Sequence, residues 1–360
     1  GEGEAAFYEI ASEIAGGSVD FSRIKGVYFR KGKDFMFTGE RELYKDIDGI
    51  GAPLIEKFEL SSYYPPIHVL GKKVVHTLTS RGCPYDCKFC AATEIFKGKI
   101  RFRSVDNVME ELKKYSGMGY DSLMFYDDSF TINRKRAIEL CKKMRDAKLW
   151  MKWMCFTRAD LVDKELLSYM KEAGCYLITF GCESGNDKTL ALLKKEVTSE
   201  TNYKGIKLTR EAGILAASTF MMGLPGESYE DIEKTIEFAK NSDLSFAYFP
   251  IFEPYKGTPI FDICKETGKW IKDSDHKNSL LEFQEEIWVP DGITRKEIEA
   301  LTKKAFKEFY FRYNTIISLL CNTIMHLPAR RKMRFAASGI DFFLMKNFRK
   351  TPKRVGSRYC

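Results

Sequence analysis

The sequence predicts an α/β fold with a parallel sheet, and two observations carry this prediction. Short apolar runs alternate with amphipathic stretches through the middle of the chain, at intervals of about thirty residues, as in consecutive βα units. The chain has 360 residues, of which 44% are hydrophobic, so it can bury the core of one large domain with appendages. Six such units can be counted, and a closed eight-stranded barrel would need two more strands.

The elements follow one another in a regular order. Residues 20–66 predict a short β-hairpin and a linker that ends in prolines. The predicted strands are short apolar runs that lie at 74–80, 122–126, 151–157, 176–182, 214–222 and 246–252. The predicted helices have a helical apolar period and lie at 105–115, 134–147, 164–173, 200–212, 229–241 and 296–320.

Three cysteines in the run R-G-C-P-Y-D-C-K-F-C decide the chemistry that the sequence predicts. Cys83, Cys87 and Cys90 are separated by three and two residues. Thiolates hold the iron of iron–sulfur clusters, and a cubane normally has four protein ligands, so a triplet leaves one iron open to another ligand. A zinc site would need four closed ligands, and no further Cys or His follows nearby. We therefore interpret the triplet as a cluster site.

The triplet, with Phe89 directly before its last cysteine, resembles the radical S-adenosylmethionine (SAM) superfamily. The longer run S-R-G-C-P-Y-D-C-K-F-C resembles the subgroup in which this core follows a cobalamin-binding domain, as in the anaerobic Mg-protoporphyrin ester cyclase-like enzymes. The resemblance implies a partial (β/α)6 barrel, a 4Fe-4S cluster on the three cysteines, and SAM chelated to the fourth iron. It also implies an external electron donor of the ferredoxin or flavodoxin type and reductive cleavage of SAM to a 5′-deoxyadenosyl radical.

In a parallel α/β fold, functional residues gather at the carboxyl ends of the strands. The ends of the second and third predicted strands resemble SAM-contacting segments of that family. Tyr126, Asp127 and Asp128 occupy the place of the segment that meets the methionine amino group. The alternative is that one of these acids caps the helix that begins near residue 133. Arg158 is suited to a two-point contact with the SAM carboxylate. The alternative for Arg158 is a surface ion pair with an acid at 163 or 165.

The next strands end in further matches. Glu183 and Ser184 resemble the pair that contacts the ribose. Gly223, Pro225 and Gly226 resemble the loop on which the adenine and the methionyl part rest, since glycine allows a close backbone approach. The run F-E-P-Y-K-G-T-P at 252–259 resembles the turn that closes the adenosine pocket, so the resemblance extends over residues 68–270.

The N-terminal part departs from the subgroup. The opening G-E-G-E before a helical stretch resembles the last βα junction of a cobalamin-binding domain, but the preceding sheet is absent. The near match to D-x-H-x-x-G at 66–71 has proline in place of aspartate, so we do not interpret His68 as a corrinoid ligand. We expect a truncated chain, an incomplete reading frame or a natural member without most of that module. The predicted domains are a remnant and linker at 1–67, a radical SAM core at 68–270 and a helical extension with a basic tail at 271–360.

The net charge of +8 is concentrated in the C-terminal tail. Residues 320–360 hold ten Lys or Arg and one acid, so the rest of the chain is nearly neutral. The uncharged stretch at 314–327 is too short to span a bilayer, which takes about 20 residues. Three interpretations of the tail remain: a helix packed across the open side of the barrel, a helix at a lipid interface, and, less favoured, binding of nucleic acid.

The other seven cysteines are scattered, several of them in apolar strand-like runs, and we interpret them as core packing. This pattern predicts a reducing, cytoplasmic location, peripheral to the membrane if the tail binds lipid. The predicted function is a radical SAM enzyme that modifies a C–H bond of a hydrophobic substrate, by methylation, cyclisation or a similar reaction, with cobalamin implied by the subgroup alone. Two alternatives remain: a methylthiotransferase-like enzyme on RNA or protein, and an accessory iron–sulfur protein at a membrane. The catalytic acid and base are not identified.

Overall fold

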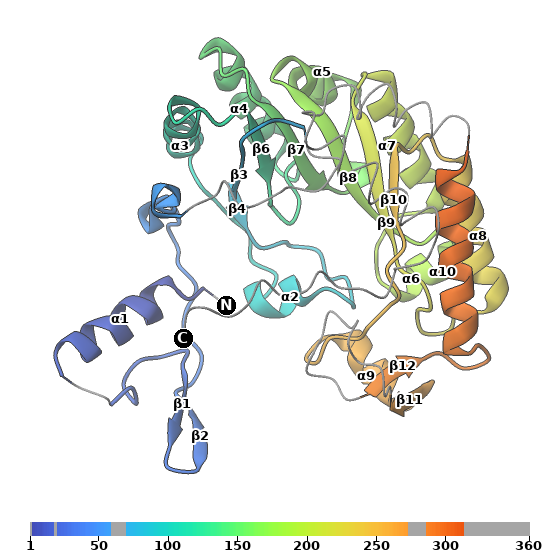
Figure 1. Ribbon diagram of the computed structural model, residues 1–360, viewed down its shortest axis with the longest axis horizontal. Helices are drawn as coiled ribbons and strands as arrows, with labels where there is room; N and C mark the ends of the chain where they lie inside the picture. Colours follow the sequence, from blue (N-terminus) through green and yellow to red (C-terminus); the bar gives the residue numbers. More distant parts are fainter. Residues whose placement is uncertain (1, 18–19, 59–69, 273–285, 313–360) are drawn as a thin grey trace.

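The structure is a computed structural model that describes residues 2–17, 20–58, 70–272 and 286–312. Its centre is a sheet of six parallel strands in the order β10-β9-β8-β7-β6-β3. Within the described residues β3 and β10 are the two edges, so the sheet curves without closing (Figure 1). This confirms the predicted partial (β/α)6 barrel. The strands are β3 (Val74–Thr77), β6 (Ser122–Phe125), β7 (Lys152–Thr157), β8 (Cys175–Glu183), β9 (Leu215–Phe220) and β10 (Phe246–Tyr248).

Helices return the chain from the end of each strand to the start of the next, and they form an arc around the outer face of the sheet (Figure 1). Each begins at a residue whose side-chain oxygen accepts a backbone N–H of the first turn, namely Ser104, Asn133, Asp163, Thr198 and Ser228. These caps confirm the predicted helix starts to within one residue. The helices are α3 (Val105–Gly117), α4 (Arg134–Asp146), α5 (Lys164–Glu172), α7 (Ser199–Glu211) and α8 (Tyr229–Asn241).

Side chains of the strands alternate between two cores, which is why the strand runs are apolar almost throughout. On the outer face, Leu123, Phe125 and Trp153 belong to the large core beneath the helices. On the inner face, Met124 and Met154 belong to a smaller cluster. Both faces of the sheet are therefore apolar, and polar groups are left to the strand ends.

The last strand is shorter than the predicted run at 246–252, because Pro250 has no N–H to donate to a ladder. The pairing continues as a single parallel bridge between Met222 and Ile251. The backbone N–H of Met222 donates to the carbonyl of Pro250 over 2.9 Å, and the N–H of Phe252 donates to the carbonyl of Met222 over 2.9 Å. The ends of β9 and β10 therefore remain side by side beyond the strands themselves.

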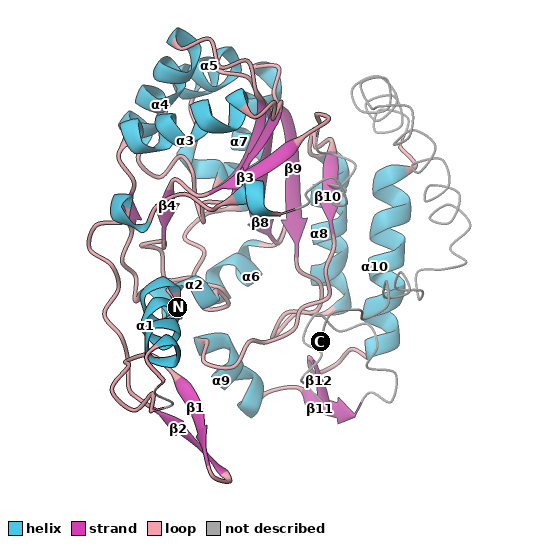
Figure 2. Ribbon diagram, turned by 60° about the vertical axis from the view of Figure 1, so that its left-hand side comes forward, coloured by secondary structure: helices cyan, strands magenta, loops and turns pink. Residues whose placement is uncertain are grey.

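The C-terminal part adds a helix along the edge of the barrel. After α9 (Pro259–Glu266) and the antiparallel pair β11 (Lys269–Lys272) and β12 (Glu286–Val289), α10 (Arg295–Tyr310) packs beside α8 and β10 (Figure 2). The described part of the predicted 296–320 helix thus ends at Tyr310. The uncharged stretch at 314–327 and the basic tail at 320–360 lie outside the described residues. Among the helices that are described, none has the length and apolar character needed to cross a bilayer.

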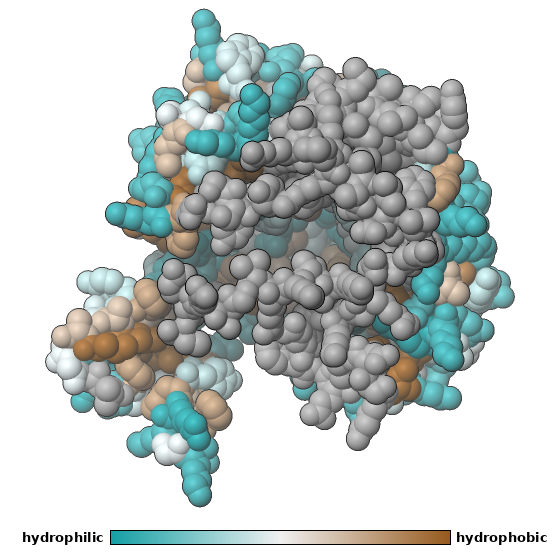
Figure 3. All heavy atoms as spheres, viewed as in Figure 1, coloured by the Kyte–Doolittle hydropathy of each residue, from teal (hydrophilic) through white to brown (hydrophobic). Residues whose placement is uncertain are grey.

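The N-terminal segment is joined to the barrel by ion pairs. It contains α1 (Glu4–Ala15) and the predicted hairpin, β1 (Tyr28–Lys31) with β2 (Asp34–Phe37), whose antiparallel pairing confirms that prediction. Glu2 accepts from Arg101 over 2.8 Å and from Arg81 over 3.2 Å, and both arginines belong to the barrel. Figure 3 shows hydrophobic surface over α1. The segment with His68 lies outside the described residues.

Candidate functional site

The three cysteines lie on one loop at the carboxyl edge of the sheet. The loop runs from β4 (Ser80–Arg81) to α2 (Ala91–Phe96), and β4 pairs with β5 (Arg101–Phe102) to close its base. The backbone N–H of Cys90 donates to the carbonyl of Cys87 over 3.0 Å, which turns the chain between these two thiols. Burial raises the pKa of all three thiols, and the charge of Cys90 further raises the pKa of Cys83 and Cys87. The loop therefore gathers three soft donors.

Two buried cations flank this loop. The guanidinium carbon of Arg158 lies 3.7 Å from the ring centroid of Tyr85, between Cys83 and Cys87 in the sequence. The ammonium of Lys195 lies 5.8 Å from the ring centroid of Phe89. The positive charges of Lys195 and Arg158 both oppose the rise in the pKa of Cys87. Positive charge beside the cysteines favours thiolates, the form that binds iron.

Arg158 lies at the end of β7, as predicted, but its guanidinium already donates to other groups of the protein. Nε and Nη2 donate to the two carboxylate oxygens of Asp160 over 2.9 Å and 3.0 Å, and Nη1 donates to the carbonyl of Lys195 over 2.9 Å. The alternative surface ion pair with Asp163 or Glu165 is wrong, because both of these acids pair with Arg134. Arg158 thus fastens the end of β7 to the loop that carries Lys195.

Glu183, at the end of β8, forms a buried ion pair with Lys195. The Glu183 Oε1 and Lys195 Nζ atoms are 3.6 Å apart, and the two side chains are 11% and 8% exposed. Glu183 has φ of +67°, a left-handed conformation that non-glycine residues rarely adopt. A Cβ at Gly181 would lie 2.4 Å from Glu183 Oε1 and 3.3 Å from Lys195 Nζ, so the glycine leaves room for this pair. The sequence did not single out Lys195.

Ser184 is directed away from Glu183 into the protein. It is fully buried, its hydroxyl lies 3.0 Å from that of Thr235 on α8, and it accepts the backbone N–H of Asn186 over 3.1 Å. These contacts fix the turn after β8 against α8. Of the two residues predicted to contact the ribose, Glu183 is therefore the one that lies beside the cysteine loop.

The acids after β6 hold the start of the cysteine loop. Asp127 is buried and accepts from the backbone N–H of Thr79 over 3.0 Å, from the Thr79 hydroxyl over 2.9 Å and from the Ser80 hydroxyl over 2.5 Å. Asp128 accepts the backbone N–H of Gly82 over 3.1 Å. The alternative that one of these acids caps the next helix is wrong, because the side chain of Asn133 is the cap. The side chain of Tyr126 is directed away from these contacts, and Tyr126 is 46% exposed.

The glycine loop after β9 is organised by a buried acid that the sequence motif contained but did not single out. Gly223 and Gly226 have φ of +83° and +73°, which favour glycine, with Pro225 between them. Glu227 Oε2 accepts the backbone N–H groups of Gly223 and Leu224 over 3.1 Å and 2.9 Å. Burial raises the pKa of Glu227 to about 7. The sequence contained a signal for this acid, because Glu227 directly follows the run G-L-P-G.

We expect Glu227 to make stability depend on pH. Its folded pKa of about 7 lies above the ordinary value of 4.5, so the folded protein keeps a proton that the unfolded chain loses between these values. The free energy of unfolding should therefore fall by up to about 3 kcal/mol as pH rises from about 4.5 to 7, and then level off. Urea unfolding across this range checks the effect.

Glu227→Gln should remove this part of the slope, because glutamine does not titrate and its carbonyl can still accept from Gly223 and Leu224. Glu211→Gln, at an exposed position at the end of α7, is the control and should keep the wild-type slope. Equal slopes for wild type and Glu227→Gln would contradict the assignment.

The last predicted turn also meets the cysteine loop. The backbone N–H of Ile260, directly after the 252–259 turn, donates to the carbonyl of Lys88 over 3.0 Å. From the other side, the N–H of Lys88 donates to the carbonyl of Leu193 over 3.0 Å. The loops that follow β3, β8 and β10 are thus in direct contact around Cys87 and Cys90.

An open (β/α)6 barrel with a cysteine triplet in the loop after its first strand defines the class of radical SAM proteins. Residues 77–239 match the model of the radical SAM superfamily, so this part of the chain is a radical SAM domain.

The sequences of two relatives align with most of this chain. It is 29% identical over 318 residues to an uncharacterized methyltransferase of Pyrococcus horikoshii, covering 88% of this chain and 68% of that protein. It is 29% identical over 322 residues to the anaerobic magnesium-protoporphyrin IX monomethyl ester cyclase of Cereibacter sphaeroides, covering 87% of this chain and 51% of the cyclase. The chain therefore spans about half the length of the cyclase.

Solved structures show the same fold. The radical SAM methyltransferase TsrM from Kitasatospora setae, with tryptophan and a SAM analogue bound, superposes with a TM-score of 0.66 at 18% identity, covering 84% of this chain and 66% of TsrM. The cobalamin-dependent SAM radical enzyme OxsB gives 0.67 at 15% identity, covering 95% of this chain and 54% of OxsB. At these identities the likeness shows the fold alone.

Proposed function

We propose that this chain is the catalytic part of a radical SAM enzyme that modifies a C–H bond of a hydrophobic substrate. The observation that carries the proposal is the cysteine loop, which gathers Cys83, Cys87 and Cys90 at the carboxyl edge of a radical SAM domain and between two buried cations. The names of the two relatives described above support methylation and cyclisation.

The residues fit a 4Fe-4S cluster by their chemistry. Three thiol donors share one loop, and the cations at Arg158 and Lys195 offset the negative charge that a thiolate-bound cluster carries. Within the described residues no three His, Cys, Asp or Glu side chains converge closely enough to hold a single metal ion. Cys83, Cys87 and Cys90 would hold three irons of the cluster and leave the fourth for SAM.

The SAM site would follow the strand ends around this loop. Glu183 would accept from the ribose hydroxyls, and Gly223, Pro225 and Gly226 would support the adenine and methionyl parts. Asp128, whose other contact is Gly82, would accept from the methionine ammonium beside Tyr126. Lys195 would hold the SAM carboxylate, because the fork of Arg158 already binds Asp160. Asp127 and Ser184 are fully engaged within the protein and would hold the frame.

When bound, the cluster would pass one electron from an external ferredoxin- or flavodoxin-type donor to SAM, giving methionine and a 5′-deoxyadenosyl radical that takes a hydrogen atom from the substrate. The protein's own part is to orient SAM by opposite charges and to keep water out. Burial of Lys195 and Glu183 makes their contacts with SAM stronger than the same contacts in water. Cobalamin, bound by OxsB, would add methyl transfer if the whole protein binds it.

Anaerobic reconstitution with iron and sulfide, followed by dithionite and SAM, tests the proposed function. We expect about four irons per chain and reductive formation of 5′-deoxyadenosine. A protein that takes up the cluster but leaves SAM intact would contradict the enzyme assignment. That result would favour the accessory iron–sulfur protein.

We expect Lys195→Gln to weaken SAM binding by about tenfold or more, because a charge-assisted contact at a buried site contributes about 1.5–3 kcal/mol. Lys194→Gln is the matched control, since the Lys194 side chain is half exposed and pairs with Asp86 at the surface. Titration of the reconstituted proteins with SAM measures the effect, and Lys195→Arg should restore part of the affinity. Equal affinities of the two glutamine variants would assign the carboxylate to another residue.

A further inference from the structure

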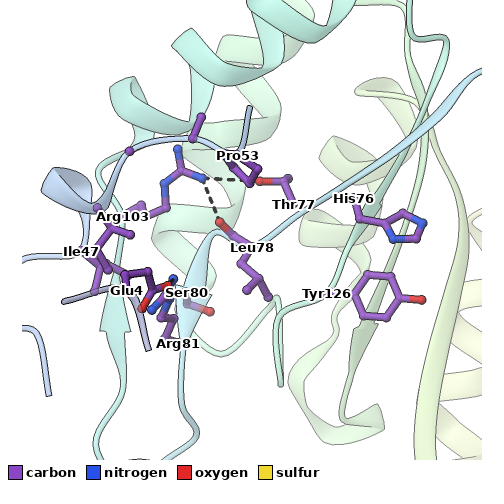
Figure 4. A pocket seen from close by; sticks show the side chains of 13 residues that line it. Glu4, Ile47, Pro53, His76, Thr77, Leu78, Ser80, Arg81, Arg103 and Tyr126 are labelled. Atoms are coloured by element: carbon purple, nitrogen blue, oxygen red, sulfur yellow. Dashed lines mark hydrogen bonds and ion pairs between the residues drawn. The ribbon is translucent and has the colours of Figure 1, made fainter. Parts of the chain in front are cut away.

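A cavity of about 460 Å³ lies between the N-terminal segment and the first strand of the barrel. Figure 4 shows its walls: Ile47 and Pro53 from the N-terminal segment, Leu78 from the chain after β3, and the rings of His76 and Tyr126. This volume lies within the range of small-molecule sites, about 300–1,000 Å³. The cavity is separate from the residues assigned above to SAM, except for Tyr126.

The walls of the cavity carry no unbalanced charge. Arg81 pairs with Glu4 over 2.5 Å and with Glu2 over 3.2 Å. Arg103 pairs with the buried Glu111. The rest of the lining includes apolar side chains such as Ile47 and Leu78. A charged ligand would lose part of its hydration in this cavity without gaining an opposite charge that is free to meet it.

One wall is aromatic. The ring centroids of His76 and Tyr126 are 4.9 Å apart, and those of Tyr126 and Phe156 are 5.3 Å apart. His76 and Tyr126 line the cavity, whereas Phe156 packs against Tyr126, and the three residues lie at the ends of the neighbouring strands β3, β6 and β7. Partial desolvation lowers the pKa of His76, which favours the neutral imidazole. An uncharged row of rings is the kind of surface on which a flat group packs.

The cavity ends beside the cysteine loop. Ser80 and Arg81 line it, and Cys83 follows two residues after Arg81. On the other side, Tyr126 lines it, and Asp127, which follows directly, accepts from the Ser80 hydroxyl. A ligand in the cavity would therefore lie next to the segments proposed to hold the cluster and SAM.

We propose that this cavity binds the substrate, and that the bound part is an uncharged, largely apolar and planar group packed against His76 and Tyr126. The assignment of this ligand as the substrate rests on the proposed function. The chemistry of the ligand rests on the walls of the cavity alone.

Two dyes with one skeleton test the proposal on the full chain. N-phenyl-1-naphthylamine is neutral, and 8-anilinonaphthalene-1-sulfonate is the same ring system with a sulfonate. We expect fluorescence titration to show one saturable site for the neutral dye and affinity at least about tenfold lower for the sulfonate. Equal affinity for the sulfonate would overturn the assignment of an uncharged ligand.

Two substitutions locate the site. Ala52→Trp places an indole in the cavity, and Leu78→Glu places a charge there, so each should weaken the neutral dye by about tenfold or more. Ala147→Trp, at an exposed position after α4, is the control and should bind the dye as the wild type does. Circular dichroism checks that the variants are folded. A dye affinity that neither cavity substitution changes would overturn the proposal.

The dye experiment needs neither cluster nor SAM, so its failure is distinguishable from failure of the proposed function. A second measurement uses the reconstituted enzyme: Ala52→Trp should still form 5′-deoxyadenosine from SAM, because Ala52 contributes to no proposed SAM contact. Dye binding that obeys these expectations in a protein that does not cleave SAM would leave the cavity as a binding site and remove only its role as the substrate site.

Discussion

Alanine in place of Cys87 should leave the purified protein without its cluster. Each cysteine supplies one of only three protein ligands, and two thiolates cannot keep a cubane that already lacks a fourth. We expect the iron content after anaerobic reconstitution to fall to about one tenth of the wild-type value or less, and 5′-deoxyadenosine formation to disappear with it. Iron and sulfide assays, with electron paramagnetic resonance of the reduced protein, measure the loss. The same result is expected for Cys83→Ala and Cys90→Ala.

Cys141→Ala provides the matched control. This thiol is buried beneath the helices, and its substitution should cost about 1 kcal/mol of stability without affecting iron uptake. Loss of the cluster in Cys141→Ala, or its retention in Cys87→Ala, would place the cluster ligands elsewhere and would contradict the assignment on which the proposed function depends.

The strand ends were predictable from the sequence because the rule behind them is geometric. Parallel strands joined by right-handed crossovers bring their carboxyl ends to one edge, so any residue directly after an apolar run is placed near that edge. Arg158 and Glu183 follow such runs and lie beside the cysteine loop. The apolar run before each residue was enough to predict that both lie at this edge.

Lys195 was not predictable in the same way. It follows the short helix α6 (Asp187–Leu192) and reaches Glu183 through a turn in which Lys194 and Glu196 have φ of +53° and +56°. Left-handed conformations at residues other than glycine leave no signature in a single sequence, because tertiary contacts impose them. The cavity is a similar case, since its walls come from residues 47–53 and from the ends of β3 and β6.

The partners of Arg158 show a further limit. The sequence analysis offered the acids at 163 and 165 as partners of Arg158, but the partner in the structure is Asp160, and the difference depends on where Arg134 lies. Arg134 begins α4 and binds the two later acids, which leaves Asp160 for Arg158. Such a competition is settled by packing between α4 and α5 and cannot be read from either segment alone.

Asp127→Ala should lower the free energy of unfolding by about 3 kcal/mol, because it leaves several buried donors without an acceptor. The carboxylate accepts from Thr79 and Ser80, and its charge partly offsets the buried guanidinium of Arg136, which donates to the Thr79 hydroxyl over 3.0 Å. Because these contacts hold the chain immediately before Gly82, the loop with Cys83 should loosen before the barrel unfolds. Urea unfolding measures the stability, and hydrogen exchange of the 79–90 backbone measures the local effect.

Asp127→Asn and Asp128→Ala separate the contributions. Asparagine keeps one acceptor for the Thr79 N–H and should cost about 1 kcal/mol, whereas Asp128→Ala removes the single contact with Gly82 and should cost about the same. If Asp127→Ala were no more destabilising than Asp128→Ala, the buried carboxylate would not be the anchor of the loop. Its position would then require another explanation, such as direct contact with SAM. The ranking of these three variants therefore distinguishes a residue that holds the frame from one that binds the ligand.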